Sequence, residues 1–457
     1  MNSDIESKTT KILFMDDEDI FYMSGLERII HTAYKHPDNP LIAADQPWED
    51  NVIMGGTVRK EGDLYRMWYQ GLKNNSIHSK LGLYAESSDG INWEKPDLGL
   101  HKDSTGSYSN NLYLNIERND HNFSVMYTPH MGKGKKYTLL SYGRERPKES
   151  APDGYYIAFS DDGICWKDGA NYPVIPGHQD VGWFTFDNKT NIFRGVVKTF
   201  LIIGNFKRRS VMYTQSKDGF NWDLPYPVVL PDAVDEEWTD GREGHNTQFY
   251  GMPIFRYESM LLGFLQVFKC TGGNVIGGAS MDGTTDVQLV CSRDGKSWKR
   301  VGDRSPILER GNNGEWDWGI VQTGHSLVSD SEELRIYYYG SSFRHGQSEP
   351  GCKNIGMASW PKDRIVGLRA GTRGGEIRIP LIGSATQLHI NANAAGGKIT
   401  ANITNSDGVP IYESNTCHIA TDSLNHTVNL HNYVAPTESV FLNLQMVDAE
   451  IFSVFWE

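Results

Sequence analysis

Acidic, imidazole and indole side chains recur in five segments of this 457-residue chain, each just before a predicted strand. The segments read QPWEDN, ERNDHN, GHQDVGW, TDGREGHNTQFY and EWDWGIVQTGH. Paired carboxylates can supply the acid and the base or nucleophile of glycoside cleavage, and aromatic rings can stack on the apolar face of a sugar. These residue types therefore favour chemistry on a sugar.

These segments, together with His345, supply the candidate site. The candidate catalytic residues are Asp50, Asp180, Glu243, Asp317 and His245, and the candidate substrate-binding residues are Glu49, His121, Trp183, Arg242, Gln248, Tyr250, Trp318, His325 and His345. In the most concrete version Glu243 is the general acid, Asp180 or Asp50 is the base or nucleophile, and Asp317 is a stabilising charge. The aromatic side chains of Trp183, Trp318 and Tyr250 then stack on the substrate and orient it.

The fourth segment is the densest, because Arg242, Glu243, His245 and Tyr250 fall within nine residues beside two glycines. Such a concentration is costly in a mere connection, although a long solvated loop is the alternative interpretation. The histidines His245, His325 and His345 are the candidates for convergence on a metal ion. None of them forms a pair with helical i, i+4 spacing or with a cysteine. We therefore expect no cofactor, and an axial metal ion is left open.

The elements that must position these residues carry a repeat. The strings SSDGINW, SDDGICW, SKDGFNW and SRDGKSW begin at Ser87, Ser160, Ser216 and Ser292, and a degenerate fifth copy contains Ser359. Each lies between strand-like runs and predicts a turn: the aspartate accepts backbone hydrogen bonds, the glycine takes a positive φ, and the tryptophan packs between sheets. We interpret these strings, called Asp boxes below, as scaffold.

Five sets of strands separated by polar turns follow the same order, which predicts an all-β chain built as a five-bladed β-propeller. From about Ile365 the strands become shorter and alternate, which is typical of a β-sandwich. We expect residues 1–364 to form the propeller, with the N-terminal segment closing the last blade, and residues 365–457 to form the sandwich. The sandwich either braces the propeller or binds carbohydrate.

Charge and composition limit the partners. With 44 basic and 57 acidic residues the net charge is −13, which argues against nucleic acid or an anionic membrane and leaves a small-molecule sugar or glycoside. Five scattered cysteines predict reduced thiols. The first residues lack the features of a secretory signal, and no apolar run of about 18 residues is present, so we expect a cytoplasmic protein. The sequence leaves the oligomeric state open.

The Asp boxes, MWYQG, YGMPIFRYE and the terminal LHINANAAGGKITANITNSDGVPI together resemble a bacterial family of five-bladed propellers similar to glycoside hydrolase families 32 and 43. The resemblance extends from about Phe14 to Trp456. It implies a sugar-sized axial pocket, with an aspartate on each of the first two inner strands and a glutamate on a later one as nucleophile, transition-state stabiliser and general acid. At the matching positions this chain has Met54, Thr128 and Gln248.

These departures leave three interpretations. The first is a glycosidase with a rearranged set of acids drawn from Asp50, Asp180, Glu243 and Asp317. The second is a lyase, isomerase or cyclase in the same pocket with His245 or Tyr250 as the base. The third is a propeller that binds sugar without catalysis. An enzyme should hold at least one group with a strongly perturbed pKa in its pocket, whereas a binding module need not.

Overall fold

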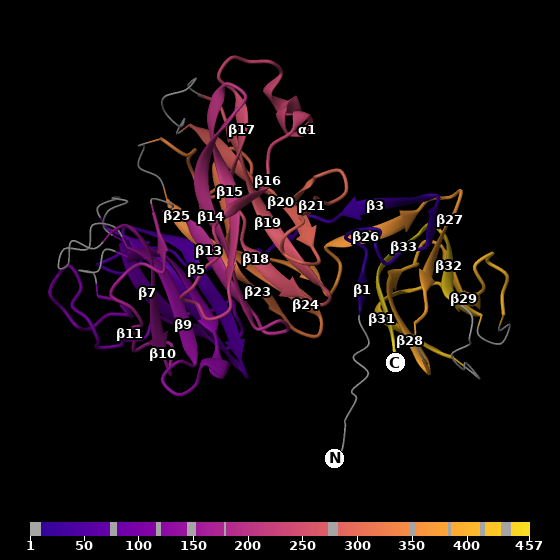
Figure 1. The fold of residues 1–457 in the computed structure, drawn as a ribbon, viewed down its shortest axis with the longest axis horizontal. Helices are drawn as coiled ribbons and strands as arrows, with labels where there is room; N and C mark the ends of the chain where they lie inside the picture. The colour runs from indigo at the N-terminus through magenta and orange to yellow at the C-terminus, as the bar shows by residue number, and fades with distance from the viewer. Residues whose placement is uncertain are drawn as a thin grey trace.

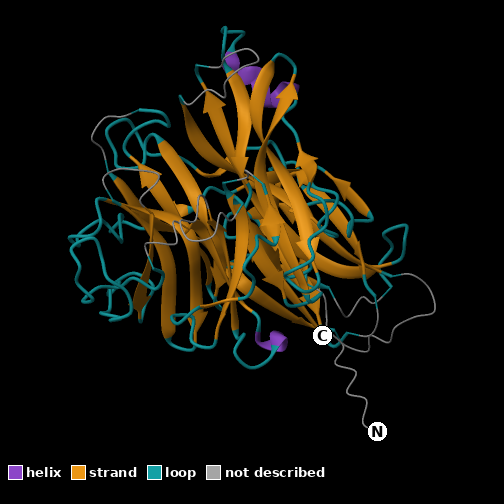
Figure 2. Cartoon of the chain, turned by 60° about the vertical axis from the view of Figure 1, so that its left-hand side comes forward, coloured by secondary structure: helices purple, strands orange, loops and turns teal. Residues whose placement is uncertain are grey.

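The computed structural model describes residues 11–73, 80–115, 120–143, 152–177, 180–272, 282–347, 352–382, 385–411, 416–430 and 440–457. Within this part of the chain almost all regular structure is strand (Figure 2), and helix is confined to three short pieces. These are η2 (Pro129–Met131), α1 (Ala233–Glu236) and η3 (Glu237–Thr239). Figure 1 shows two bodies, a larger one holding β5 to β25 and a smaller one holding β26 to β33. The predicted all-β fold, a propeller followed by a sandwich, is confirmed.

The larger body consists of antiparallel sheets that follow one another along the chain. The first three contain β5 (Asn51–Glu61), β6 (Leu64–Leu72) and β7 (Lys80–Ser87); β8 (Asp120–Tyr127), β9 (Tyr137–Gly143), β10 (Gly154–Ser160), β11 (Lys167–Asp168) and β12 (Ile175–Pro176); and β13 (Gly182–Asp187), β14 (Ile192–Ile203), β15 (Phe206–Ser216) and β16 (Tyr226–Val229).

The fourth and fifth blades complete the ring. They contain β17 (Asn246–Gly251), β18 (Ile254–Tyr257), β19 (Met260–Cys270), β20 (Gly283–Ser292), β21 (Lys299–Arg300) and β22 (Pro306–Leu308); and β23 (Ile320–Ser329), β24 (Glu333–Ser341), β25 (Lys353–Pro361) and β4 (Tyr34–Lys35). These two blades form one ten-stranded sheet because β20 and β23 pair in parallel at Thr285 and Ile320. The inner strands contact one another in the order β5, β8, β13, β18, β23 and back to β5, so the ring is closed. Side chains near the starts and ends of these strands therefore surround one axis.

Hydroxyl side chains link neighbouring inner strands that have no backbone ladder between them. The Ser326 hydroxyl on β23 accepts a hydrogen bond from the backbone N–H of Val58 on β5 at 2.8 Å, and Thr57 on β5 accepts one from Val125 on β8 at 3.0 Å. Ser124 on β8 accepts one from Phe184 on β13 at 3.1 Å. These bonds satisfy buried backbone donors and fix the register of adjacent blades.

The Asp boxes form the expected turns. In the first box the Asp89 carboxylate accepts hydrogen bonds from the backbone N–H groups of Ile91 and Asn92, both at 2.8 Å. The other three complete boxes repeat this arrangement. The Asp89 backbone oxygen also accepts a bond from Arg335 of the fifth blade at 2.6 Å. The boxes thus connect blades and lie away from the axis, as scaffold.

The N-terminal segment belongs to both bodies. Strand β4 pairs with β25 at the edge of the last blade. Strands β1 (Ile12–Leu13), β2 (Tyr22–Ser24) and β3 (Leu26–Ile30) instead pair with β33, β27 and β26 of the smaller body. The expected division at residues 364 and 365 had assigned these three strands to the propeller. Ile12 and Phe14 are buried in the sandwich core, and Met23 and Leu26 pack against it partly buried, which explains the difference.

Two sheets form the sandwich and enclose one apolar core. One sheet contains β3, β26 (Val366–Ala370), β33 (Ala449–Trp456), β28 (Gln387–Asn393) and β31 (Asp422–Asn429), with β1 paired to β33; the other contains β2, β27 (Gly375–Pro380), β32 (Phe441–Val447), β29 (Lys398–Thr404) and β30 (Cys417–Ile419).

The buried carboxylate of Asp363 joins the two bodies. It accepts hydrogen bonds from the Tyr257 hydroxyl of the fourth blade, from Lys11 at 2.9 Å and from Ser453 of the sandwich at 2.9 Å. A buried charge with three donors from three elements resists separation of the parts that supply them. None of the helices in the described residues is long and apolar enough to cross a membrane.

Candidate functional site

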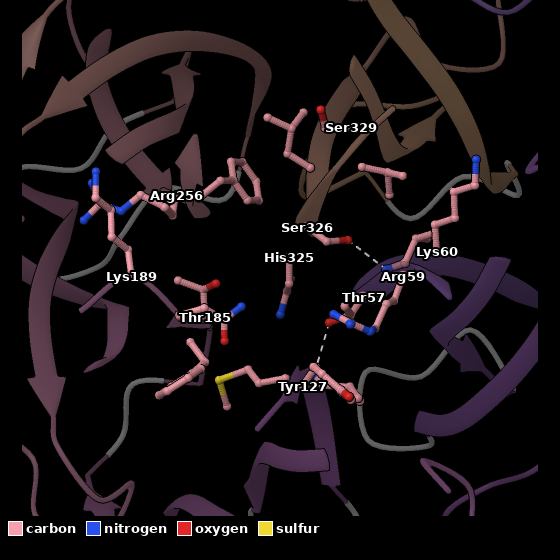
Figure 3. Close-up of a pocket in the computed structure, with 18 of the residues that line it drawn as sticks. Thr57, Arg59, Lys60, Tyr127, Thr185, Lys189, Arg256, His325, Ser326 and Ser329 are labelled. Carbon is pink, nitrogen blue, oxygen red and sulfur yellow. Dashed lines mark hydrogen bonds between the residues drawn. The ribbon is translucent and has the colours of Figure 1, made fainter. Parts of the chain in front are cut away.

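The axis of the propeller has two ends. We call the end where the inner strands begin the entrance end, and the end where they finish the far end. Asp180, Gln248 and Tyr250 lie at or near strand starts and so belong to the entrance end. A pocket of about 880 Å³ opens at the far end and is lined by the last residues of all five inner strands (Figure 3).

An ion pair lies at the entrance end, directly before β13. The Asp180 carboxylate lies 2.7 Å from the Lys198 ammonium, and the side chains are 41% and 7% exposed. Lys198 comes from the neighbouring strand β14 and is held over the ring of Tyr250 at 5.3 Å from the centroid. The carboxylate and the aromatic face both attract the ammonium group of this buried lysine. The pair leaves the Asp180 carboxylate accessible.

Tyr250 is the centre of the same cluster. Its hydroxyl lies 3.1 Å from Nε2 of His345, which is hydrogen-bonding distance. The Arg209 guanidinium lies 5.1 Å from the Tyr250 ring centroid on another side and donates to the Gln248 side-chain oxygen at 2.8 Å. Two cations, a phenol and an imidazole thus converge beside Asp180. We call Asp180, Lys198, Arg209, Tyr250 and His345 the entrance cluster.

The sequence singled out three members of this cluster and missed two. Asp180, Tyr250 and His345 were candidates, whereas Lys198 and Arg209 were not. Both cations lie in the middle of ordinary strand alternation, in VVKTF and KRRSV, where nothing local marks them. Only the length of β14 and β15, which extend to the entrance end, brings them to the site. No signal within the sequence would have identified them.

Glu49 and Asp317 lie in buried ion pairs that hold the blades together. Glu49 accepts hydrogen bonds from Lys95 at 2.6 Å and from the Tyr69 hydroxyl at 2.8 Å, and its side chain is fully buried. Asp317 pairs with Lys35 of β4 at 2.6 Å and accepts a bond from Tyr338 at 3.0 Å. The expected substrate-binding and stabilising roles are therefore replaced by anchoring roles, because both charges are already compensated.

Trp183 is a packing residue. Its side chain is 4% exposed, and its ring lies so close to Gly251 that a Cβ added there would be 1.8 Å from the ring. The glycine is needed at this point to admit the indole. Trp183 therefore supports the strand break between β17 and β18, and it has no face left for a sugar.

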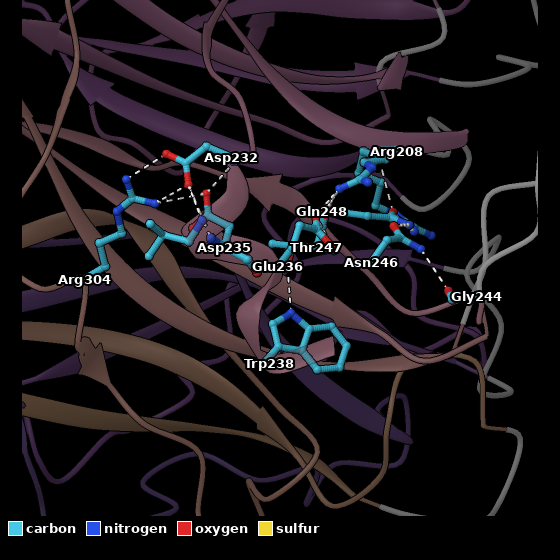
Figure 4. A network of polar contacts seen from close by, with 12 residues as sticks. Arg208, Asp232, Asp235, Glu236, Trp238, Gly244, Asn246, Thr247, Gln248 and Arg304 are labelled. Atoms are coloured by element: carbon cyan, nitrogen blue, oxygen red, sulfur yellow. Dashed lines mark hydrogen bonds and ion pairs between the residues drawn. The ribbon is translucent and has the colours of Figure 1, made fainter. Parts of the chain in front are cut away.

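In the part of the dense fourth segment that precedes β17, no described residue forms a hydrogen bond or an ion pair with the entrance cluster, although Tyr250 on β17 belongs to that cluster. Figure 4 shows Asp232, Asp235 and Arg304 in one ion-pair network, while Glu236 contacts Arg208 and Trp238 donates to Thr247. Glu243 and Arg242 are exposed in the turn that follows, and His245 stacks on Trp238 at 5.5 Å. In the described residues no contact connects Glu243 with the entrance cluster. Arg242 and Glu243 therefore lie in an exposed turn before β17, which agrees with the solvated loop given as the alternative interpretation.

The remaining candidates lie apart from the cluster. Asp50 is 36% exposed and 3.4 Å from Lys73, and His121 packs edge-on against Tyr142. Trp318 is partly buried and donates to the Ser342 backbone oxygen. His325 lies on the axis, where its Nδ1 is 2.5 Å from the Ser124 hydroxyl. Burial lowers the pKa of His325 to about 3, so the ring is neutral at pH 7.

The three histidines considered for a metal ion have different partners: Trp238, Ser124 and Tyr250. No group of three or more histidine, cysteine, aspartate or glutamate side chains suited to a metal ion occurs in the described residues.

The departures from the family pattern are placed as follows. Met54 is buried in the core of the first blade, and Thr128 follows the end of β8 at the far end, where it bonds to Thr138 at 2.7 Å. Thr128 is therefore not at the entrance end, because β8 begins at Asp120. Gln248 does lie at the entrance end, where its oxygen is occupied by Arg209.

No protein-family model matches the chain, and no curated protein matches it. Solved structures resemble it at low identity. They include a β-1,2-mannobiose phosphorylase from Listeria innocua (10% identity, 73% of this chain and 97% of that chain, TM-score 0.48), an N-acetylgalactosamine deacetylase from F. plautii (14%, 78% and 96%, 0.47) and the catalytic domain of a Coprinopsis cinerea GH62 α-L-arabinofuranosidase (12%, 73% and 99%, 0.43). Such likeness concerns the fold alone, and the resemblance to families 32 and 43 stays a prediction.

Proposed function

We propose that this chain is a carbohydrate-active enzyme that holds a small sugar or glycoside at the entrance end of the propeller axis. The observation that carries the proposal is the hydrogen bond between Tyr250 and His345 beside the Asp180–Lys198 ion pair. The entrance cluster combines hydrogen-bond donors and acceptors with positive charges and an accessible carboxylate. Such a set of groups can bind the hydroxyl groups of a sugar ring.

The cluster supports proton transfer as the central step. A phenol hydrogen-bonded to an imidazole can pass its proton to that imidazole and then take one from a substrate carbon or hydroxyl. The Lys198 and Arg209 charges, 5.3 Å and 5.1 Å from the centroid of the ring, stabilise the negative charge that develops during such a transfer. This favours the lyase, isomerase or cyclase interpretation, with Tyr250 as the base and His345 as its proton acceptor.

Glycoside hydrolysis is the second candidate, and the accessible carboxylate of Asp180 is the observation that favours it. A glycosidase needs a second carboxyl group, about 5 Å away for retention or about 6.5–9.5 Å away for inversion. Asp180 belongs to the entrance cluster through its ion pair with Lys198. Glu49 and Asp317 form ion pairs with Lys95 and Lys35, which lie outside the cluster. The hydrolase version therefore depends on Asp50 as the partner acid.

Turnover of a panel of substrates tests the proposal. The panel contains aryl furanosides, aryl pyranosides and uronic-acid disaccharides, and the products are separated by chromatography and weighed by mass spectrometry. A product with the mass of the substrate, or one that has lost an alcohol without gaining water, indicates isomerisation or elimination. A product that has gained water indicates hydrolysis.

Three variants assign the roles. Tyr250→Phe should lower kcat by about 100-fold or more if Tyr250 transfers the proton, and Asp180→Asn should do so if the carboxylate acts directly. Glu243→Gln is the matched control, because Glu243 is exposed and outside the cluster, and it should leave turnover unchanged. Binding of a sugar without turnover of any substrate would refute the enzyme and leave the non-catalytic interpretation. Turnover lost in Glu243→Gln would move the site to the fourth segment.

A further inference from the structure

The far-end pocket is basic in an acidic protein. Five cationic side chains and one anionic side chain line it, the cations being Lys11, Arg59, Lys60, Lys189 and Arg256 and the anion being Glu258. The chain as a whole carries a net charge of −13. A concave surface of opposite sign to the whole molecule concentrates ligands of the other charge. The pocket is therefore suited to an anion.

Within the described residues, three of these cations form ion pairs and two do not, and of these two Lys60 lies over the Tyr65 ring at 5.1 Å from its centroid. Arg59 pairs with Glu61 at 2.7 Å, Arg256 with the buried Asp187 at 2.6 Å, and Lys11 with Asp363 and Glu258. These pairs fix the side chains in the wall. In the described part of the chain, neither Lys60 nor Lys189 forms an ion pair, and both are exposed at the rim. The two lysines are thus available to a ligand.

The Arg59 guanidinium is also held by an aromatic ring, since it lies 4.0 Å from the centroid of Tyr127. Stacking on one face and pairing with Glu61 at Nε leave the terminal nitrogens of Arg59 at the pocket, where Figure 3 places the side chain between Thr57 and Tyr127. A guanidinium fixed in this way donates to an oxyanion at little further cost in side-chain entropy.

The floor of the pocket offers donors that lack an acceptor. His325 lies at the centre of the pocket in Figure 3, is 5% exposed, and its Nε2 has no hydrogen-bond partner among the described residues. The Ser124 hydroxyl accepts a bond from the Phe184 N–H and lies 2.5 Å from Nδ1 of His325, and we assign the hydroxyl proton to the bond with Nδ1. The neutral ring then carries its proton on Nε2, which makes that atom a donor.

Two hydroxyl groups at the floor of the pocket are also donors without an acceptor in the described residues. Thr57 and Ser326 each accept a hydrogen bond from a backbone N–H of the next strand, at 3.0 Å and 2.8 Å. In the described residues neither hydroxyl proton has an acceptor. An imidazole N–H and two hydroxyl protons at the floor, with lysines at the rim, are donors that a tetrahedral oxyanion would satisfy.

We propose that the far-end pocket is a second binding site, distinct from the entrance cluster, for a ligand that carries a phosphate or sulfate group. The oxyanion lies on His325, Thr57 and Ser326 at the floor, and Lys60 and Lys189 neutralise it from the rim. The ligand is either the inorganic ion itself or a phosphorylated or sulfated sugar, whose ring would extend toward the mouth of the pocket.

Isothermal titration calorimetry of the full chain tests this site. The probes are inorganic phosphate, inorganic sulfate, glucose 6-phosphate, glucose 6-sulfate and glucose, each measured at constant ionic strength with chloride. We expect one oxyanion site with a Kd on the order of 1 mM or below. Tighter binding of a sugar ester than of its inorganic ion identifies the ester as the ligand class, and equal binding identifies the ion. Absence of binding by all four anions refutes the site.

Variants locate the binding. Lys60→Gln with Lys189→Gln should weaken the binding of phosphate by about three- to tenfold. Lys207→Gln removes an exposed lysine elsewhere and should change nothing, and Asp180→Asn should leave phosphate binding intact because it belongs to the other end. Equal weakening by Lys207→Gln would show a general charge effect and overturn the proposal.

A second pair of variants addresses the floor. His325→Asn places its amide near Nδ1 and loses the donor at Nε2, whereas His325→Gln extends an amide N–H toward the position of Nε2. We expect about tenfold weaker phosphate binding for the asparagine and near-normal binding for the glutamine. Normal binding by the asparagine variant would exclude His325 from the site, and the lysine pair remains as the independent test if either variant fails to fold.

Discussion

Asp187 supports the third blade and its neighbour through charge, and its removal should be costly. The carboxylate is fully buried and lies 2.6 Å from Nη2 of Arg256 and 3.1 Å from Nε of Arg194. It also accepts a hydrogen bond from the Thr190 hydroxyl at 2.8 Å. Burial raises the pKa of Asp187, but the bonds and charges of Arg256, Thr190 and Arg194 outweigh this and bring the pKa from 3.8 down to about 2.

The pKa gives the size of the effect. Moving it from 3.8 to about 2 corresponds to about 2.4 kcal/mol of folding free energy, at about 1.36 kcal/mol per pH unit. Because the pKa is lowered in the folded state, this stability is fully present above about pH 4 and is lost as the pH falls toward 2. About 1 kcal/mol of it should be gone at pH 3. The substitution Asp187→Asn should cost about 3 kcal/mol at pH 7, because it also leaves Arg194 with a buried, uncompensated charge.

The assay is urea unfolding followed by tryptophan fluorescence at pH 7 and at pH 3, with Asp63→Asn in an exposed turn as the control. We expect Asp187→Asn to be much less stable than wild type at pH 7 and to lose about 1 kcal/mol less than wild type on going to pH 3. Identical pH dependence of the variant and wild type would refute the claim that Asp187 is a charged partner of these arginines.

Three further predictions follow from the packing. Gly251→Ala should lower the free energy of unfolding by about 1–3 kcal/mol, because the new methyl group meets the Trp183 ring, whereas Gly371→Ala, with open space at its Cβ, should be close to neutral in the same denaturation assay. Asp317→Asn should destabilise the fold by about 3 kcal/mol because it breaks the ion pair with Lys35, and kcat per folded molecule should stay unchanged. A loss of kcat without a loss of stability would show that Asp317 takes part in catalysis. A thiol reagent should label the exposed Cys165 and Cys352 of the native protein before it labels the buried cysteines. Among the buried ones, burial raises the pKa of Cys291 to about 12, which disfavours the reactive thiolate.

The sequence predicted local features well, because their causes are local. In each Asp box the aspartate bonds to backbone groups two and three residues away, so the turn could be identified without any knowledge of the fold. The all-β class followed from the spacing of these turns. Asp180 could be chosen because it precedes a strand, and strand starts in a propeller meet at one end.

The remainder of the site depended on contacts across blades. Glu49 and Asp180 look equivalent in the sequence, yet Lys95, which is 46 residues away, buries the first, and Lys198 leaves the second accessible. Which lysine pairs with which carboxylate depends on which strands become neighbours in the fold. A local sequence pattern does not contain this information. The same holds for Arg209 and for the N-terminal strands, whose partners are at the opposite end of the chain.

The pairing of β1 with β33 has a consequence for how the protein is made. Ile12 is opposite Val454, so this strand has no partner until about 440 further residues have been synthesised. At about 5–20 residues per second, that delay amounts to roughly 20 to 90 s. During this time the N-terminal strands that end up in the sandwich, and β4 until β25 has been made, are open to wrong partners. The nascent chain should therefore depend on chaperones more than its stable final fold would suggest.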